Sequence, residues 1–225
     1  MEESVIYQYD FQTILDRIIL PGLRESLIML GGTVVTCTFF GFVLALILIT
    51  TDVNGLRPNR LVYETISAII NVLRSVPFII LIITIIPLTR LVVGTTIGTT
   101  AAIFSITIVG SPLIARLLEG CFKEVNPSLI EAAKSFGASD WQITFHVIVS
   151  ESIPSIVSHL TLGYVSLLGF TAMAGTVGAG GLGAVALTYG YQNFNDTIMY
   201  STVVILIIIV QFIQFGGNFL YRKLK

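Results

Sequence analysis

Charged side chains and cysteine are scarce in this sequence, and each shortage argues against a class of function. Only 11% of the 225 residues are charged and 54% are hydrophobic, whereas soluble domains carry about 25% charged residues. The composition therefore predicts an integral membrane protein. With a net charge of −1, the chain has no basic patch to neutralise phosphates, which argues against a nucleic-acid partner. The spacing of Cys37 and Cys121 fits no metal or redox pattern.

Three further signals are missing or misleading. No cleavable signal peptide is expected, because the N-terminus is acidic and the first long apolar run begins only near Ser26. The sequence contains no Walker A motif, so any ATP chemistry must come from another polypeptide. Gly178, Gly180 and Gly183 match the dinucleotide-binding pattern GxGxxG, but no strand is predicted before them. These glycines instead predict close helix contacts or irregular backbone surrounded by protein.

Long apolar runs predict an all-α membrane protein with five transmembrane helices. The first run, residues 26–50, reaches about 37 Å at helical rise, enough to cross a bilayer core of about 30 Å. The other spans are expected at about residues 61–89, 94–115, 152–172 and 197–221. Before them, helical spacing of apolar residues within residues 1–25 predicts an interfacial helix, interrupted near Pro21 and the glycine after it.

The second predicted span contains a charged residue and a proline. A charge at the bilayer centre costs about 2.5 to 3.5 kcal/mol on insertion scales, so Arg74 must face protein or water. Pro77 leaves the carbonyl of Leu73 free for another partner. Two interpretations stay open: Arg74 lines a pathway, or it extends to the cytoplasmic headgroups. In the fourth span, His159 is expected to be a hydrogen-bonded packing residue.

One polar segment, residues 126–151, separates the third and fourth spans and is too polar to cross a bilayer. Asn126 and the proline after it form a helix-start signal, and Gly137 is a plausible stop. Ser139 and Gln142 have the spacing of a capping box, which predicts a second helix directly afterwards. The segment is therefore expected to form two helices joined by a glycine bend.

The distribution of Lys and Arg predicts the orientation of the chain. With five spans the termini lie on opposite sides of the membrane. One side holds Arg57, Arg60, Arg116, Lys123, Lys134, Arg222, Lys223 and Lys225, and the other holds Arg17, Arg24 and Arg90. The richer side should be cytoplasmic, which places the N-terminus outside and both the C-terminus and residues 126–151 in the cytoplasm.

Within the polar segment, Glu131-Ala132-Ala133 followed by Gly137-Ala138 resembles the EAA loop of ABC importer permeases. In that family the loop is a cytoplasmic coupling helix that docks into a groove of the ATP-hydrolysing subunit. The motif alone fits an amphipathic helix on the membrane surface equally well. The cytoplasmic placement predicted from charge favours the permease. The sequence departs from the family at Ser150, where many members have a proline.

The resemblance extends over most of the chain, from about residue 20 to residue 222. Residues 73–79, 86–90, 172–183 and 189–191 together look like those of methionine ABC importer permeases. The resemblance implies a type I ABC importer permease fold in a bacterial cytoplasmic (inner) membrane. It further implies a complex of two copies of this chain, two ATPase subunits and an extracytoplasmic methionine-binding lipoprotein. ATP and Mg²⁺ would then be bound by the partner ATPase, and no cofactor by this chain.

Individual residues are given roles as hypotheses, none of them catalytic or metal-binding. The docking contacts with the ATPase would be Glu131, Ala132, Ala133, Phe136, Gly137 and Ala138. The translocation pathway for D- and L-methionine would include Arg74, Ser75, Pro77, Met173 and Gly175. Two alternatives stay open: an ABC permease for another amino acid or small nutrient, and an ion-coupled secondary transporter. The latter class carries ionisable groups within the membrane, for which only Arg74 and His159 qualify here.

Overall fold

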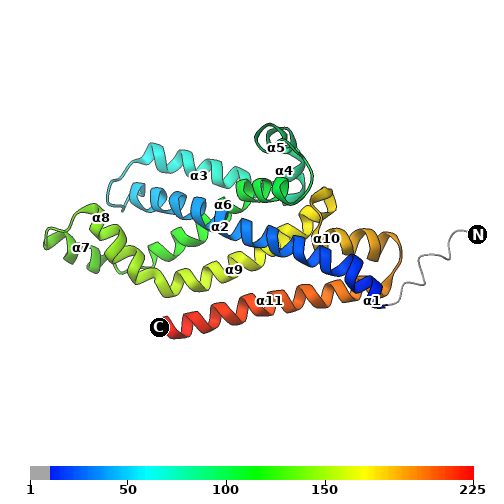
Figure 1. The fold of residues 1–225 in the computed structure, drawn as a ribbon. Coiled ribbons are helices and arrows are strands. Elements are labelled where there is room, and N and C mark those ends of the chain that lie inside the picture. The colour runs from blue at the N-terminus through cyan, green and yellow to red at the C-terminus, as the bar shows by residue number, and fades with distance from the viewer. Residues whose placement is uncertain (1–10) are drawn as a thin grey trace, which may run out of the picture. The chain divides into compact units, whose positions relative to one another are not determined.

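The computed structural model describes residues 11–225, and these form helices joined by short turns (Figure 1). The α-helices are α1 (Phe11–Ile14), α2 (Leu20–Thr51), α3 (Arg60–Ser75), α4 (Phe78–Thr84), α5 (Ile86–Val93), α6 (Thr99–Lys123), α7 (Pro127–Ser135), α8 (Asp140–Gln142), α9 (Ser150–Ala174), α10 (Gly181–Ala184) and α11 (Asp196–Leu224). Wider π-helical turns occupy Leu15–Ile19, Ile143–Val149, Gly175–Ala179 and Val185–Gln192. The described residues contain no strand, so the predicted all-α class is confirmed.

Four helical runs are long and apolar enough to cross a membrane. They are Gln12–Thr51, Thr99–Lys123, Asp140–Ala179 and Asp196–Leu224. A fifth span exists if α3 and α4, which meet at a bend of 107°, are counted as one. The chain is therefore a multi-pass membrane protein of four or five spans.

The predicted second span, residues 61–89, is divided in the structure into α3, α4 and α5. The break falls at Val76, which is extended at φ −87 and ψ 131. Pro77 explains it, because a proline disfavours helical backbone in the residue before it and has no N–H for the helical ladder. The proline that was expected to free one carbonyl thus ends the helix.

At the N-terminus the structure differs from the expected interruption near Pro21. Residues 11–51 are helical throughout, and the π-helical turn Leu15–Ile19 lies directly before the proline. Such a wide turn shifts the hydrogen-bonding pattern and makes room for a residue that cannot donate. Residues 11–25 therefore continue into the first span rather than forming a separate interfacial helix. The rest of that predicted element, residues 1–10, lies outside the described residues.

The chain divides into two compact units. Unit 1 comprises Met1–Val35, Phe78–Thr107 and Ser166–Phe212, and unit 2 comprises Thr36–Pro77, Ile108–Val165 and Ile213–Lys225. In unit 1, the buried core joins Ile14 and Ile19 to residues of α10 and α11. In unit 2, Leu48 of α2, Ile70 of α3 and Ala115 of α6 form a buried cluster. In unit 2 this packing holds α6, whose end leads into the polar segment, against α2 and α3.

Candidate functional site

Residues 126–151 of unit 2, here called the polar hairpin, form the predicted pair of helices (Figure 1). The Asn126 side chain accepts a hydrogen bond from the Ser128 N–H at 3.0 Å, so it caps α7 as expected. Gly137 follows α7 with φ 79, the left-handed conformation that ends many helices. No atom lies within 4 Å of a Cβ built at this position. The glycine is therefore required by its backbone conformation and not by crowding.

The second helix of the hairpin starts as the sequence predicts. The Ser139 hydroxyl accepts a hydrogen bond from the Gln142 N–H at 3.3 Å. In return, the Gln142 side chain accepts one from the Ser139 N–H at 2.8 Å. The predicted capping box is thus confirmed. Because both ends of the bend are fixed by caps, the hairpin has a defined shape without a core of its own.

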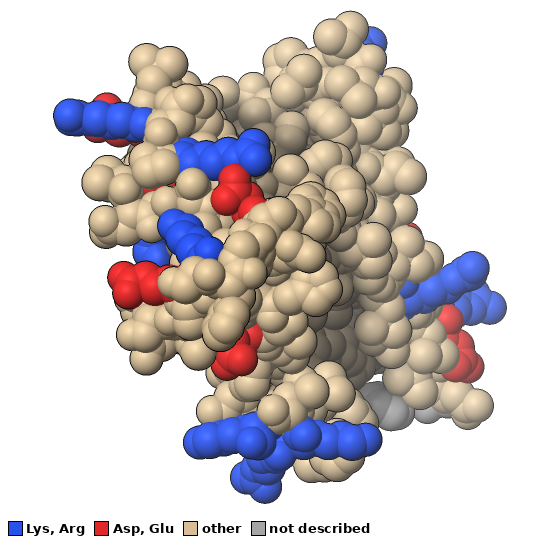
Figure 2. All heavy atoms as spheres, turned by 90° about the vertical axis from the view of Figure 1, so that its left-hand side faces the viewer, with Lys and Arg blue, Asp and Glu red and all other residues tan. Residues whose placement is uncertain are grey.

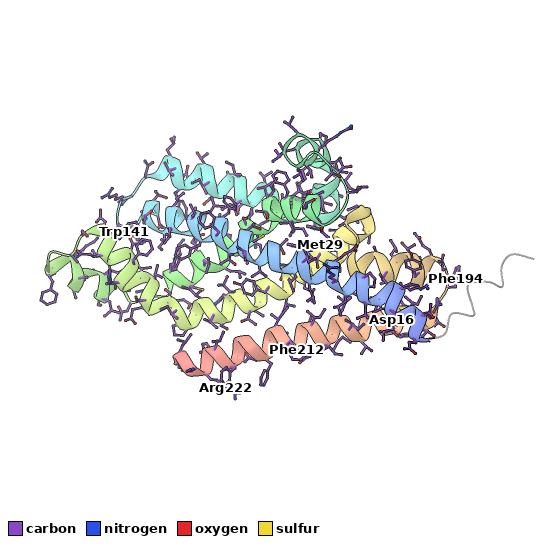
Figure 3. The ribbon with its side chains drawn as sticks, in the orientation of Figure 1. Asp16, Met29, Trp141, Phe194, Phe212 and Arg222 are labelled. Carbon is purple, nitrogen blue, oxygen red and sulfur yellow. The ribbon has the colours of Figure 1, made fainter. Side chains whose placement is uncertain are left out.

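The hairpin presents large apolar side chains to its surroundings. No residue of α7 is buried, Phe136 is 91% exposed, and Trp141 at the start of α8 is 69% exposed (Figure 3). Phe136, Gly137 and Ala138 line a hollow of about 420 Å³ together with Gln142, His146 and Val147. Exposed apolar groups around a hollow are typical of interaction sites. Of the predicted docking residues, three thus line one hollow, while Glu131, Ala132 and Ala133 lie on α7.

Two serines hold together the base of the hairpin, where the end of α6 and the start of α9 lead into and out of it. The buried Ser152 hydroxyl donates to the Cys121 carbonyl at 3.1 Å, and Ser155 donates to the Glu124 carboxylate at 2.5 Å. These bonds join the end of α6 to the start of α9. His159 Nδ1 lies 2.9 Å from the Ser155 carbonyl oxygen, in agreement with the expected packing role.

A group of four charges beside this base was not predicted from the sequence. Glu119 pairs with Arg116 at 2.6 Å and with Lys123 at 2.9 Å, and Lys123 also pairs with Asp52 at 2.8 Å. Burial raises the pKa of Asp52, but the hydrogen bond from Lys123 and those from backbone N–H groups outweigh burial and lower it below the ordinary value. The available signal was the i, i+3 and i+4 spacing of charges on α6, and nothing local pointed to Asp52.

The predicted pathway residues fall into two groups in different units. Arg74, Ser75 and Pro77 lie at the break between α3 and α4, and all three are exposed. The Ser75 hydroxyl donates to the Val72 carbonyl at 2.8 Å. Met173 is exposed near the end of α9, whereas Gly175 is buried. Their role in a pathway stays a prediction.

The glycine-rich stretch forms the irregular backbone that the sequence predicts. Gly178, Gly180 and Gly181 have φ of 94, 82 and 78, so the helical run breaks there. A Cβ at Gly175 would lie 2.5 Å from the Ala184 nitrogen, and one at Gly183 would lie 1.9 Å from the Ala172 carbonyl oxygen. Neighbouring backbone segments therefore approach each other too closely for any side chain.

Two residues of α2, which sequence reasoning missed, hold this break in place within unit 1. The Glu25 carboxylate accepts a hydrogen bond from the Gly181 N–H at 2.7 Å. The Ser26 hydroxyl accepts one from the Leu182 N–H at 2.8 Å. Both satisfy N–H groups at the start of α10 that have no helical partner. The signal was a polar pair at the entrance to an otherwise apolar span.

These features define the class: an all-α, multi-pass membrane protein with an exposed polar hairpin and a glycine-rich helix break. Among residues 12–225, no group of three or more His, Cys, Asp or Glu side chains could hold a metal ion. The model of the family "Binding-protein-dependent transport system inner membrane component" matches residues 38–225. The chain belongs to this family.

Individual relatives agree with this assignment and confirm the resemblance to ABC importer permeases. The probable D-methionine transport system permease protein MetI of Vibrio cholerae is 48% identical over 183 residues, 81% of each chain. The methionine import system permease protein MetP of Bacillus subtilis is 41% identical over 172 residues, 76% of this chain and 78% of MetP.

Solved structures confirm the fold. A structure of inward-facing conformations of the MetNI methionine ABC transporter matches with a TM-score of 0.91 and 38% identity, over 94% of this chain and 98% of that chain. An amino acid ABC transporter crystallised with histidines has a TM-score of 0.76 at 19% identity, over 96% and 99% of the two chains. The second similarity shows the fold alone.

Proposed function

We propose that this chain is the non-catalytic permease subunit of an ATP-driven ABC importer and forms the translocation pathway for D- and L-methionine. The observation that carries the proposal is the similarity, along nearly the whole chain, to the permease of a methionine ABC transporter. The relatives from Vibrio cholerae and Bacillus subtilis, both named for methionine, support the same substrate. An importer of another amino acid or small nutrient with the same mechanism is the second candidate.

The working complex contains two copies of this chain, two ATPase subunits and an extracytoplasmic methionine-binding lipoprotein. ATP and Mg²⁺ are bound by the ATPase subunits. A chain without an internal two-fold repeat builds a symmetric pathway by pairing with a second copy about a two-fold axis. Exposed aromatic side chains on the part of α11 in unit 2, Phe215 and Phe219, offer an apolar surface for lipid or for a second copy.

The polar hairpin is the coupling element in this proposal. Phe136 inserts into a groove of the ATPase, and Ala132, Ala133 and Ala138 allow close approach because their side chains are small. Glu131, which is exposed on α7, faces basic or polar groups of the ATPase. When ATP binding closes the ATPase subunits, the docked hairpin moves with them and switches the pathway from inward to outward opening.

The pathway itself involves residues at the two helix breaks. Arg74, Ser75 and Pro77 border the break between α3 and α4. Met173 and Gly175 border the glycine-rich break. Broken helices line cavities in membrane proteins because their free backbone groups need partners other than lipid.

The chain resides in the bacterial cytoplasmic (inner) membrane with its N-terminus outside and its C-terminus in the cytoplasm. Near the ends of the predicted spans, eight Lys and Arg residues lie on the side of the C-terminus, and three, Arg17, Arg24 and Arg90, lie on the side of the N-terminus. Figure 2 shows basic side chains on the side where Figure 1 draws α7, α8 and the C-terminus, all parts of unit 2. An excess of Lys and Arg is the mark of a cytoplasmic side.

Reconstitution in proteoliposomes tests the proposal. The chain is co-expressed with the ATPase encoded beside it, and uptake of labelled methionine is measured with and without ATP and the binding protein. We expect uptake that requires all three proteins and ATP. ATP hydrolysis without methionine uptake would overturn the substrate, and uptake by this chain alone along an ion gradient would overturn the class.

A further inference from the structure

We infer that the four charged residues Asp52, Arg116, Glu119 and Lys123, here called the charge quartet, lock the base of the polar hairpin to α3 and to the end of α2. These elements then move as one body, and Glu119 is the positioning residue at its centre. The inference rests on the proposed coupling function and adds to it the elements that receive the hairpin's movement. All the residues involved belong to unit 2.

Glu119 is the buried centre of the quartet, with 3% of its surface exposed. One carboxylate oxygen accepts from Arg116 at 2.6 Å. The other lies 2.9 Å from Lys123 Nζ and accepts from the Tyr63 hydroxyl at 3.1 Å. Two acidic and two basic groups balance in charge, so no member is left uncompensated. The other three members are partly exposed, and Lys123 is 43% exposed. A network around a buried carboxylate still holds its parts in one arrangement, because breaking a link to Glu119 leaves its buried charge without that partner.

The quartet connects three elements. Asp52 directly follows α2, and its carboxylate lies 2.8 Å from Lys123 Nζ at the end of α6. Arg116 donates to the Asn71 side chain of α3 at 3.2 Å. The Tyr63 hydroxyl, also on α3, accepts from Lys123 at 3.2 Å. The ends of α2, α3 and α6 are thus joined by polar links in addition to their apolar core.

The quartet is also continuous with the polar hairpin. Lys123 is the last residue of α6, and the hairpin begins three residues later at Asn126. The Ser152 and Ser155 hydrogen bonds fasten α9 to residues 121 and 124 on the same stretch. On the surface, Arg57 pairs with Asp140 at 2.6 Å and ties the loop after α2 to the start of α8. A displacement of the hairpin is therefore passed to α2 and α3 through short, directional contacts.

A second ion pair on α3 serves as a matched control. Arg60 and Glu64 also pair at 2.6 Å, but their side chains are 83% and 61% exposed. Exposed pairs contribute little, because water and salt screen them. Glu64→Gln is therefore the same chemical change as Glu119→Gln in the same unit, but it is made at an exposed ion pair and not at a buried carboxylate.

The experiment compares these variants in the full complex of permease, ATPase and binding protein. ATP hydrolysis and methionine uptake are measured in the same proteoliposomes, and the result is the number of methionines carried per ATP. For Glu119→Gln we expect hydrolysis close to that of the wild type and a ratio reduced about tenfold, within the range seen for mutations in transmitting networks. Glu64→Gln should leave the ratio unchanged.

Each outcome separates the inference from the function on which it rests. If the wild-type complex carries no methionine with ATP, the proposed function fails. If the wild type transports and Glu119→Gln keeps its ratio, or loses hydrolysis and uptake in proportion, the quartet has no role in coupling. If Glu119→Gln does not assemble, Asp52→Asn is tested in its place, because it removes only the link to the end of α2. A lowered ratio of methionine carried per ATP in Asp52→Asn supports the inference, and a normal ratio overturns it.

Discussion

The bend at Gly137 offers the sharpest test of the proposed coupling role of the polar hairpin. Gly137 has φ 79, and a Cβ placed there would meet nothing within 4 Å. Any effect of a substitution therefore comes from backbone strain alone. A residue with a Cβ in this conformation costs roughly 1–2 kcal/mol, a β-branched one more, and asparagine less. The series Gly137→Asn, Gly137→Ala and Gly137→Val should thus weaken the bend in that order.

The hairpin has no buried residue on α7, so the strain should distort the hairpin and leave the spans intact. We expect normal membrane insertion for all three variants and a graded loss of ATP-driven methionine uptake, largest for valine. Gly94 supplies the control, because it ends α5 with φ 82 and its Cβ position is equally open. Gly94→Val adds the same strain outside the hairpin and should retain the ratio of uptake to hydrolysis. Wild-type uptake by Gly137→Val would refute the reasoning.

Three further predictions follow from local geometry. Phe136→Ala should change the thermal stability of the chain by no more than about 0.5 kcal/mol, because the ring is 91% exposed, yet weaken co-purification of the ATPase. Gly183→Ala should destabilise the chain by about 1–3 kcal/mol or more, because its Cβ would lie 1.9 Å from the Ala172 oxygen. Gly169→Ala is the control and should not destabilise the chain, because its Cβ would meet no atom within 4 Å. Equal melting temperatures for the two variants would contradict the prediction. The pKa of Asp52 in the folded chain lies below its ordinary value of 3.8. The ionised carboxylate therefore stabilises the fold above pH 3.8, and this stabilisation is lost as the pH falls through the folded-state pKa. In Asp52→Asn, the free energy of unfolding should fall less steeply with decreasing pH in this acid range.

Features decided by neighbouring residues could be predicted from the sequence. The caps at Asn126 and Ser139 and the stop at Gly137 depend only on side chains within three residues, and all three appear in the structure. The irregular backbone around Gly178 was likewise predicted from the number of glycines in that stretch. Apolar runs gave the long spans, because a bilayer requires about twenty apolar residues per helix.

Features decided by distant residues could not be predicted. Asp52 and Lys123 are far apart in sequence, and only the packing of α2 and α6 in unit 2 brings them to 2.8 Å. The hydrogen bond between Glu25 and the Gly181 N–H spans 156 residues, and the polar pair at Glu25 and Ser26 did not indicate which residues it contacts. The break at Val76 was partly visible, since Pro77 was recognised as an interruption, but the sequence did not show that residues 61–89 would form three separate helices.

The exposure of Phe136 and Trp141 has a consequence for the life of the free chain in the cell. A subunit made in excess of its ATPase would expose these aromatic rings to solvent. Exposed apolar surface of this kind is recognised by chaperones and proteases. Synthesis of the two subunits in matched amounts would then protect the permease, and unassembled copies would be removed first. The surface that we propose to contact the ATPase would thus mark unassembled copies for removal.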